Sequence, residues 1–405
     1  MMTYVEFFDK TSVRNICTCL ADDPDKVIFV GDNKKLMKKF IGIYRELFSK
    51  RGKNIDFCYR CVTKNDIDTV IRVLSEIVEE NEETVFDLDG GDDVFLMAVG
   101  MIYERYFDRN IKLQRVNVSN NSICFGTKEE KYIPGLSVPE HIRIYDGNVI
   151  FDDVIHEGTH RWDYTEDFKE DIDRMWDICR RDNSLWNREI KDLQVMEKKR
   201  MPSKDTLYTV IQKSSLERPV DVKIMKSLVK AGLILDYKET DAYISYRYKN
   251  EQVRRCLTKA GQALEMKIYS VAKSVLDTKG NAVYDDVMNG VCIDWDGEDL
   301  TSGEGIVVEN EIDVMMTKGV VPVFISCKNG QVDVDELYKL NTVAQRFGGD
   351  YAKKVLVVNS LERNGGDSAE FFRDRARSMG IRLLENVHHM TENELERAIK
   401  NLWRT

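Results

Sequence analysis

Short hydrophobic runs and amphipathic stretches alternate over the first third of the chain. Runs of β-branched and aromatic residues predict four strands, in the sequences YVEFF, VIFVGD, IDFCYRCV and TVFDLD. Between them, apolar residues recur at three- and four-residue spacing at 34–51 and 66–80, which predicts two helices. Because such alternation builds βαβ units, we expect a mainly parallel, doubly wound, Rossmann-like sheet, extended by two further strands at 112–119 and 122–126.

The pattern changes beyond residue 160. Residues 166–199 are highly charged with a helical period, and residues 203–256 change character again. There the sequence SLVKAGLI, followed by LDYKETDAYISYRYKN, predicts a helix, a turn marked by glycine and a two-stranded wing. Such a winged-helix pattern is compatible with DNA binding and equally with a connector or a dimer contact.

The last third begins with an amphipathic helix predicted at 257–276, with Glu265 beside its apolar stripe. Three strands are predicted next, at 289–295, 305–316 and 320–328, and the turn TKGV joins the last two as a hairpin. A helix at 335–349 and a strand at 353–360 complete an αβββαβ arrangement. The whole chain is therefore expected to be an α/β protein.

Strand alternation sorts the polar residues of this last part onto particular faces. In the second strand, one face holds Glu309, Glu311 and Asp313, and the other holds Val308, Ile312 and Val314. In the third strand, Ser326 and Lys328 lie opposite Val323, Ile325 and Cys327. Divalent-metal phosphodiesterases use this combination, because carboxylates hold Mg²⁺ or Mn²⁺ and a lysine positions or deprotonates the attacking water.

Composition and charge narrow the function classes. A chain of 405 residues is long enough for two or three domains, and 42% hydrophobic with 32% charged residues is globular composition. The net charge of −10 counts against a protein that coats nucleic acid through bulk positive charge, although not against a nuclease. We find no apolar run that could span a bilayer and no basic segment typical of a signal peptide at the start, so a cytoplasmic protein without membrane contact is expected.

Nine cysteines in such a chain favour reduced thiols over disulfides. Cys58 and Cys61 form a CxxC, and Cys17 and Cys19 form a CxC, which together have the ligands of a zinc site. Both pairs lie in predicted hydrophobic elements, so we favour buried thiols as the interpretation.

The carboxyl edge of the predicted N-terminal sheet is unusually polar. The first strand leads into Asp9, Lys10, Thr11 and Ser12, the second into Asp32 and Asn33, and the fourth into DLDGGDD at 87–93. Gly90 and Gly91 would let backbone amides approach a phosphate at the start of the next helix. Asp92 and Asp93 serve equally well as helix caps, so a ligand site and ordinary capping both remain open. No GxGxxG occurs, which argues against a dinucleotide redox cofactor as the ligand.

The C-terminal core resembles the PD-(D/E)xK nuclease superfamily. Its motif stands here as Asp313 and Ser326–Cys327–Lys328, with Glu265 in place of the helical glutamate of many members. Ser326 departs from the pattern, since an acid usually stands there, and Glu309, Glu311 or Glu265 then has to supply the missing charge. The resemblance implies the catalytic residues Lys328, Asp313, Glu309, Glu265 and Ser326. It implies Mn²⁺ or Mg²⁺ held by Asp313, Glu309 and Glu265. An inactive core with Asp313 and Lys328 as a simple ion pair is the alternative.

Over its full length the chain resembles type III CRISPR-associated effectors that join a CARF domain to such a nuclease. We accordingly expect a CARF domain at 1–155, a helical and winged-helix-like connector at 156–256 and a nuclease domain at 257–405. The resemblance implies a homodimer that binds a cyclic oligoadenylate, commonly cyclic tetra-adenylate, and then cleaves DNA, RNA or both. The implied ligand contacts are Thr11, Ser12, Asp32, Asn33, Gly90, Gly91 and Asp92.

Two rival functions remain. His156, Glu157 and His160 satisfy HExxH, the zinc-protease motif, with Glu166 and Glu170 downstream. Gly158 weakens the helix that the motif requires, so we expect a strand-to-helix junction there instead. The other rival is a ligand-responsive transcription regulator that acts through the winged helix and has an inactive nuclease-like domain, but it leaves Asp313 and Lys328 unexplained.

Overall fold

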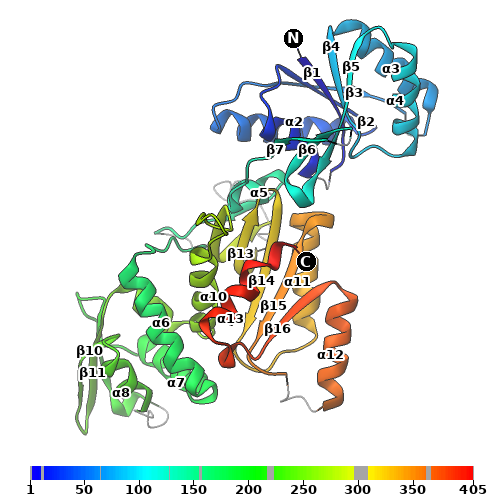
Figure 1. Ribbon diagram of the computed structural model, residues 1–405. Helices are drawn as coiled ribbons and strands as arrows, with labels where there is room; N and C mark the ends of the chain where they lie inside the picture. Colours follow the sequence, from blue (N-terminus) through cyan, green and yellow to red (C-terminus); the bar gives the residue numbers. More distant parts are fainter. Residues whose placement is uncertain are drawn as a thin grey trace.

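The computed structural model describes residues 2–10, 13–63, 65–126, 128–154, 157–216, 223–295, 309–361 and 366–404. These residues form three sheets. Figure 1 shows the seven-stranded sheet at one end, joined through helix α5 (Val138–Ile144) to a six-stranded sheet. A small three-stranded sheet with its helices lies beside the six-stranded sheet. None of the helices in the described ranges combines the length and apolar character needed to cross a membrane.

The N-terminal domain is the predicted Rossmann-like sheet, with strand order β3-β2-β1-β4-β5-β6-β7. Its strands are β1 (Met2–Phe7), β2 (Lys26–Gly31), β3 (Asp56–Cys61), β4 (Glu83–Asp87), β5 (Asn110–Asn117), β6 (Ser122–Phe125) and β7 (Lys128–Tyr132). The first five strands pair in parallel, and β6 and β7 continue the sheet antiparallel. The helices are α1 (Cys17–Ala21), α2 (Lys34–Lys50), α3 (Ile67–Glu80) and α4 (Asp93–Arg105). Helix α2 packs in one hydrophobic cluster, whereas α3 and α4 pack in a second one on the other face.

The middle of the chain has the winged-helix arrangement. It comprises α6 (Glu166–Arg181), α7 (Asn183–Lys198), β9 (Tyr208–Gln212), α8 (Lys223–Lys230), β10 (Ile234–Glu239), β11 (Tyr243–Tyr248) and α9 (Glu251–Thr258). Strands β10 and β11 form the expected wing after Gly232, which has a positive φ of 72°. Strand β9, which the sequence pattern did not indicate, adds a third antiparallel strand to β11.

The C-terminal part contains the predicted αβββαβ core. Its sheet has the order β16-β15-β14-β13-β12-β8. The strands are β8 (Asn148–Ile150), β12 (Asp286–Asp294), β13 (Glu309–Lys318), β14 (Val321–Lys328), β15 (Lys353–Val358) and β16 (Ile381–Glu385). The helices are α10 (Gln262–Ser274), α11 (Asp335–Gly348), α12 (Gly366–Ser378) and α13 (Glu392–Lys400).

Three details differ from the sequence-based expectation. Strand β8 lies within the range expected for the first domain, yet it pairs with β12 of the C-terminal sheet. The helix expected from residue 257 is divided, because Gly261 takes a positive φ of 85° between α9 and α10. Ile312 and Val314 do not share a face, since they pack in different hydrophobic clusters. Gly290, opposite this point on β12, has a positive φ of 60°, and the register of the two strands is unbroken on both sides of it.

The cysteines are free thiols throughout the structure. Cys17 and Cys19 are buried, as the sequence pattern favoured, whereas Cys61 is exposed and Cys58 is only half-buried. The expectation of burial was therefore wrong for the CxxC pair, because β3 is the edge strand of its sheet.

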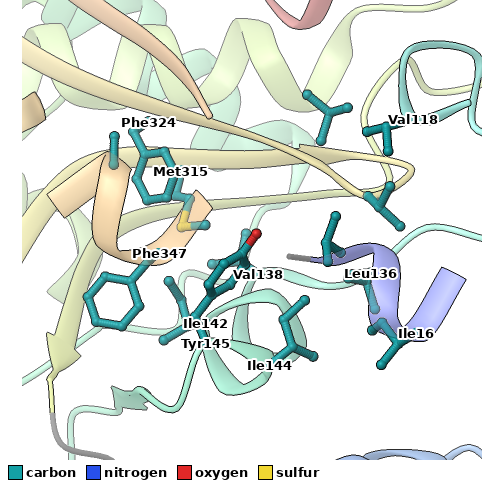
Figure 2. Packing of buried hydrophobic residues seen from close by; sticks show 14 of the residues in the cluster. Ile16, Val118, Leu136, Val138, Ile142, Ile144, Tyr145, Met315, Phe324 and Phe347 are labelled. Atoms are coloured by element: carbon teal, nitrogen blue, oxygen red, sulfur yellow. The ribbon is translucent and has the colours of Figure 1, made fainter. Parts of the chain in front are cut away.

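Helix α5 (Val138–Ile144) joins the two large sheets through a continuous apolar cluster. Figure 2 shows Val138, Ile142 and Ile144 of this helix packed between Ile16 on one side and Met315, Phe324 and Phe347 on the other. Arg51, just after α2, binds the α5 residue Glu140 at 2.7 Å, which fixes the helix to the N-terminal domain. The core of the N-terminal domain thus extends without a break into one face of the C-terminal sheet.

The tip of the β13–β14 hairpin also reaches the N-terminal domain. Asn121, between η2 (Val118–Asn120) and β6, accepts a hydrogen bond from the Val320 amide at 3.1 Å. Gly319 fits there because a Cβ would lie 1.8 Å from the Asn121 amide oxygen. The Gly319 carbonyl accepts from the Leu136 amide at 3.0 Å. The two strands that bear Asp313 and Lys328 are therefore bound to the N-terminal domain at their hairpin end.

Candidate functional site

Asp313 lies where strands β13 and β14 part. The pairing of these strands runs from Lys318–Val321 to Val314–Ile325, and Asp313 is the next residue. Its carboxylate accepts hydrogen bonds from the Cys327 amide at 2.6 Å and from the Ser326 hydroxyl at 3.2 Å. The Lys328 ammonium lies 4.0 Å from the same carboxylate. The predicted motif residues Asp313, Ser326 and Lys328 are therefore brought together, with Ser326 acting as a donor to Asp313.

Glu265 of α10 faces this point from a buried position. Its side chain is 5% exposed, and its Oε2 has no hydrogen-bond partner. Burial, together with the nearby negative charges of Asp313 and Glu311, raises the pKa of Glu265 to about 8. Burial likewise raises the pKa of Asp313. An unpartnered carboxylate oxygen beside other acids is costly unless a cation or a proton compensates it.

Two lysines flank the acids. Lys328 forms an ion pair with Glu336 of α11 at 3.0 Å. Burial lowers the pKa of Lys328, but the negative charges of Asp313 and Glu336 outweigh this effect and hold the pKa above its usual value. Lys259 pairs with Glu311, and although burial lowers its pKa too, the nearby Glu265 and Glu311 raise it. Both lysines are therefore cations at neutral pH.

A buried amide network holds the backbone at Asp313. Asn289 of β12 donates to the Asp313 carbonyl at 2.9 Å. Its own Oδ1 accepts from Gln262 of α10 at 3.0 Å and from the Trp162 indole at 3.2 Å. Asn289 and Gln262 are each 3% exposed. Because each group is satisfied within the network, β12, α10 and the segment before α6 fix the position of Asp313 together.

The acidic side chains at this point are suited to binding a hard divalent cation. Glu265 supplies an unpartnered carboxylate oxygen and Asp313 supplies a second carboxylate, which are the oxygen ligands that Mg²⁺ and Mn²⁺ prefer. Within the described ranges no three His, Cys, Asp or Glu side chains converge closely enough to hold an ion. Glu309 begins β13, but its side chain lies outside the part that the structure describes.

Glu336 and Lys259 were missed by sequence reasoning. Glu336 lies in the first turn of α11, where acids are common for helix-dipole reasons, so its position gave no distinct signal. Burial raises the pKa of Glu336, but hydrogen bonds from Lys339 and Lys328 outweigh this effect and hold the pKa below its usual value. Lys259 lies between α9 and α10, within the range expected to be one helix.

The expected ligand edge of the N-terminal domain is only partly described. Asp32 is exposed after β2, and Asn33 caps α2 by accepting from the Leu36 amide at 3.0 Å. Asp92 caps α4 by accepting from the Val94 and Phe95 amides. Gly90 has a positive φ of 85°, and a Cβ there would lie 2.6 Å from the Phe7 carbonyl oxygen. Thr11 and Ser12 lie outside the described residues.

The structure therefore shows capping at two of these positions. Gly90 and Gly91 keep the chain against Phe7 of β1, because a side chain at Gly91 would lie 3.0 Å from the Phe7 ring. The carboxyl ends of β1, β2 and β4 lie on neighbouring strands, as the sequence predicted. The assignment of these residues to a ligand remains a prediction.

A buried acid lies directly beneath this edge. Asp87, at the end of β4, is fully buried and accepts hydrogen bonds from the Asp89 amide and the Gln114 side chain, each at 2.9 Å. Burial is the main cause that raises the pKa of Asp87 to about 7. The Gln114 Oε1 has no hydrogen-bond partner. If position 87 carried a neutral amide, the Gln114 side-chain amide could rotate so that this oxygen accepts a hydrogen bond from it.

The Asp87→Asn variant is expected to gain stability over the wild type as pH rises. In the unfolded chain the Asp87 carboxyl has a pKa of about 4. Between that value and about 7 the folded wild type binds more protons than the unfolded chain, so its stability falls as pH rises and stays lowered above pH 7. Thermal melts at pH 5, 6, 7 and 8 should give a difference in Tm that widens by a few degrees. A difference that is the same at every pH would contradict this assignment.

The described part of the HExxH segment, residues 157–160, is not helical. His156 lies outside the described residues, Thr159 makes a β-bridge to Phe151, and α6 begins only at Glu166. His160 Nδ1 lies 2.9 Å from Asp152, which also binds Arg255 at 2.9 Å. The segment connects β8 to α6, so the expected strand-to-helix junction is confirmed, and the helix that a zinc protease needs is missing at residues 157–165.

No protein family and no curated protein matches this chain at the level of its sequence. Solved structures match it over nearly its full length. One is the protein VC1899 from Vibrio cholerae, with a TM-score of 0.72 and 18% identity over 100% of this chain and 97% of that one. Another is Can2 from Sulfobacillus thermosulfidooxidans in complex with cyclic tetra-adenylate, with a TM-score of 0.66 and 15% identity over 98% and 99% of the two chains.

These likenesses establish the fold. The chain combines a Rossmann-like N-terminal domain, a winged-helix-like segment and an αβββαβ domain in one polypeptide. The predicted fold class is therefore confirmed, and so is the resemblance to CARF–nuclease effectors at the level of the fold.

Proposed function

We propose that the protein is a metal-dependent endonuclease of type III CRISPR antiviral defence that a cyclic oligoadenylate activates. The observation that carries this proposal is the meeting of Glu265, Asp313 and Lys328 where β13 and β14 part, in a chain that also has a CARF fold. The proposed activator is cyclic tetra-adenylate, which the similar protein Can2 binds. The proposed substrates are DNA, RNA or both.

In the proposed site Asp313, Glu265 and Glu309 would hold Mn²⁺ or Mg²⁺. When bound, such an ion activates water and stabilises negative charge on the phosphate. The neighbours of Lys328 keep it protonated, so it would stabilise the developing phosphate charge instead of removing a proton. Ser326 and the Cys327 amide orient the Asp313 carboxylate through their hydrogen bonds.

The activator would bind across a homodimer. Helix α4 supports this arrangement because it exposes a set of large apolar side chains, namely Leu96, Met97, Met101 and Tyr103, with Phe107 just beyond the helix at 84% exposure. The N-terminus of α4 follows Gly90 and Gly91, so a two-fold contact along α4 would bring two copies of the ligand edge together. A two-fold symmetric ring of nucleotides fits such a site.

Activation would pass through the β13–β14 hairpin. Its tip is hydrogen-bonded to Asn121 and Leu136, while its other end carries Asp313 and Lys328. A ligand that stabilises one arrangement of the N-terminal domains would then favour one position of this hairpin.

The Asn121→Gly variant is expected to weaken activation while leaving ligand affinity unchanged. Asn121 has a φ of 50°, which glycine adopts freely, so the change removes the bond to the Val320 amide without backbone strain. A buried amide left without a partner costs about 1–3 kcal/mol. The ratio of cleavage rates with and without cyclic tetra-adenylate should fall. An unchanged ratio would exclude this contact from the coupling.

The test of the proposed function is cleavage of labelled single-stranded DNA, single-stranded RNA and supercoiled plasmid. Each is incubated with Mn²⁺ or Mg²⁺, with and without cyclic tetra-adenylate. Cleavage only with both the metal and the activator supports the proposal and identifies the substrate. Equal rates with and without the activator would overturn the gating, and no cleavage under any condition would favour a winged-helix regulator with an inactive nuclease-like domain.

A further inference from the structure

A polar pocket that begins at Asn329, the residue after Lys328, lies at the carboxyl ends of three parallel strands. Its volume is about 260 Å³. Asn329 and Gly330 follow β14, Asn359 and Ser360 follow β15, and His388 and His389 follow β16 by way of Asn386. The opposite wall comes from the end of α6 and the first turn of α7, with Arg180, Arg181 and Ser184. We call this set the edge pocket.

The edge pocket gathers cations that carboxylates do not neutralise. No acidic side chain among the described residues forms an ion pair with Arg180 or Arg181, and Arg180 donates only to the Met390 carbonyl, at 3.2 Å. The single acid of the lining, Asp182, caps α7 by accepting from the Leu185 amide at 2.9 Å.

Two further polar atoms of the pocket have no partner. They are His388 Nδ1 and Asn359 Oδ1, and the Asn359 side chain is only 3% exposed. Burial lowers the pKa of His388, and the charges of His389 and Arg180 lower it further, so the local field is positive. The first turn of α7 adds backbone amides, which favour an anion as well.

We propose that the edge pocket binds a backbone phosphate of the nucleic-acid strand, next to the phosphate that is cleaved. This inference rests on the proposed nuclease function. Asn329 and Gly330 are one and two residues from Lys328, and consecutive residues of an extended chain lie about 3.3 Å apart, so the pocket begins within about 7 Å of the Lys328 backbone. Nucleotides of a strand lie about 3.4 Å apart along a duplex, so the distance corresponds to one or two nucleotides.

The chemistry of the pocket favours a nucleic-acid strand over a free anion. The guanidinium groups and the α7 amides suit a phosphate. The buried Asn359 Oδ1 instead accepts a hydrogen bond, which a sugar hydroxyl or a base amino group beside the phosphate supplies and a bare phosphate ion does not.

The test measures binding of a fluorescein-labelled single-stranded DNA 20-mer and its RNA equivalent to the full chain with cyclic tetra-adenylate and EDTA, over a series of salt concentrations. Arg181→Gln is expected to weaken binding several-fold and to lower the slope of log affinity against log salt by about 0.7, the value for one phosphate contact on a single strand. His389→Gln should act in the same direction. The matched control is Arg174→Gln on the same helix, whose side chain pairs with Glu170 and which should keep the wild-type slope.

Each outcome bears on a different claim. A wild type that binds and cleaves, with unchanged slopes in both pocket variants, overturns the edge pocket alone. A wild type that neither binds nor cleaves either strand overturns the proposed function and the pocket assignment with it. If inorganic phosphate raises the Tm of the wild type but not of Arg181→Gln, while the slopes for the 20-mers are equal, the pocket holds free anions and the inference fails.

Discussion

The Lys328→Ala variant is expected to cleave about 100- to 1,000-fold more slowly than the wild type, the cost typical of losing one fixed donor to a developing oxyanion. Lys328 is held as a cation between Asp313 at 4.0 Å and Glu336 at 3.0 Å. Its removal leaves both acids without this charge. Cleavage of the substrate identified above is measured at saturating cyclic tetra-adenylate, and the affinity for the activator is measured separately and should not change.

The structure offers a matched control for this experiment. Lys339 binds the same Glu336 carboxylate at 2.8 Å, but its side chain is 68% exposed and it makes no contact with Asp313. The Lys339→Ala variant should therefore retain cleavage within a few-fold of the wild type. Equal losses in the two variants would show that Glu336, not the phosphate, is what Lys328 serves, and an active Lys328→Ala variant would remove the lysine from the reaction.

The Met97→Glu variant is expected to abolish dimer formation and with it the response to the activator. Met97 is 59% exposed on the apolar face of α4, and two such faces in contact would bury each new carboxylate in a nonpolar interface. Sedimentation should show a monomer where the wild type forms a dimer. Activated cleavage should fall to the rate measured without cyclic tetra-adenylate.

A control for this variant is Met201→Glu. Met201 is a 48% exposed methionine in the middle of the chain, far from α4 in the sequence. It should leave both the sedimentation and the activation unchanged. A Met97→Glu protein that remains dimeric would move the interface away from α4, and a monomer that still responds to the activator would separate dimer formation from gating.

The sequence pattern predicted most of the strands, because their residues either alternate between apolar and polar or form continuous apolar runs. It also brought Asp313, Ser326 and Lys328 together correctly, since a hairpin closed by TKGV fixes the register of its two strands. Glu265 was found because it lies beside the apolar stripe of the predicted helix and matches the helical glutamate of the nuclease superfamily that the core resembles. These are local signals, with the hairpin as the longest connection that had to be inferred.

The parts that escaped prediction depend on distant contacts. Strand β8 was assigned to the first domain because nothing in three residues tells which of two sheets they join. The change of face between Ile312 and Val314 lies opposite Gly290, a positive-φ residue on another strand. Glu336 approaches Lys328 only after α11 packs against the sheet, and the edge pocket needs residues from five separate elements. The periodicity of a sequence contains no information on contacts between residues that lie far apart in it.

The unbroken apolar cluster around α5 has a consequence for how this protein could diversify. A gene fusion that exchanged the N-terminal domain at the end of β7 would leave Val138, Ile142 and Ile144 without their neighbour Ile16, and Asn121 would no longer meet the hairpin tip. Both fragments would then expose apolar surface to water. The two domains are therefore inherited most easily as one unit, and any recombinant that keeps only one of them has to redesign the α5 surface as well.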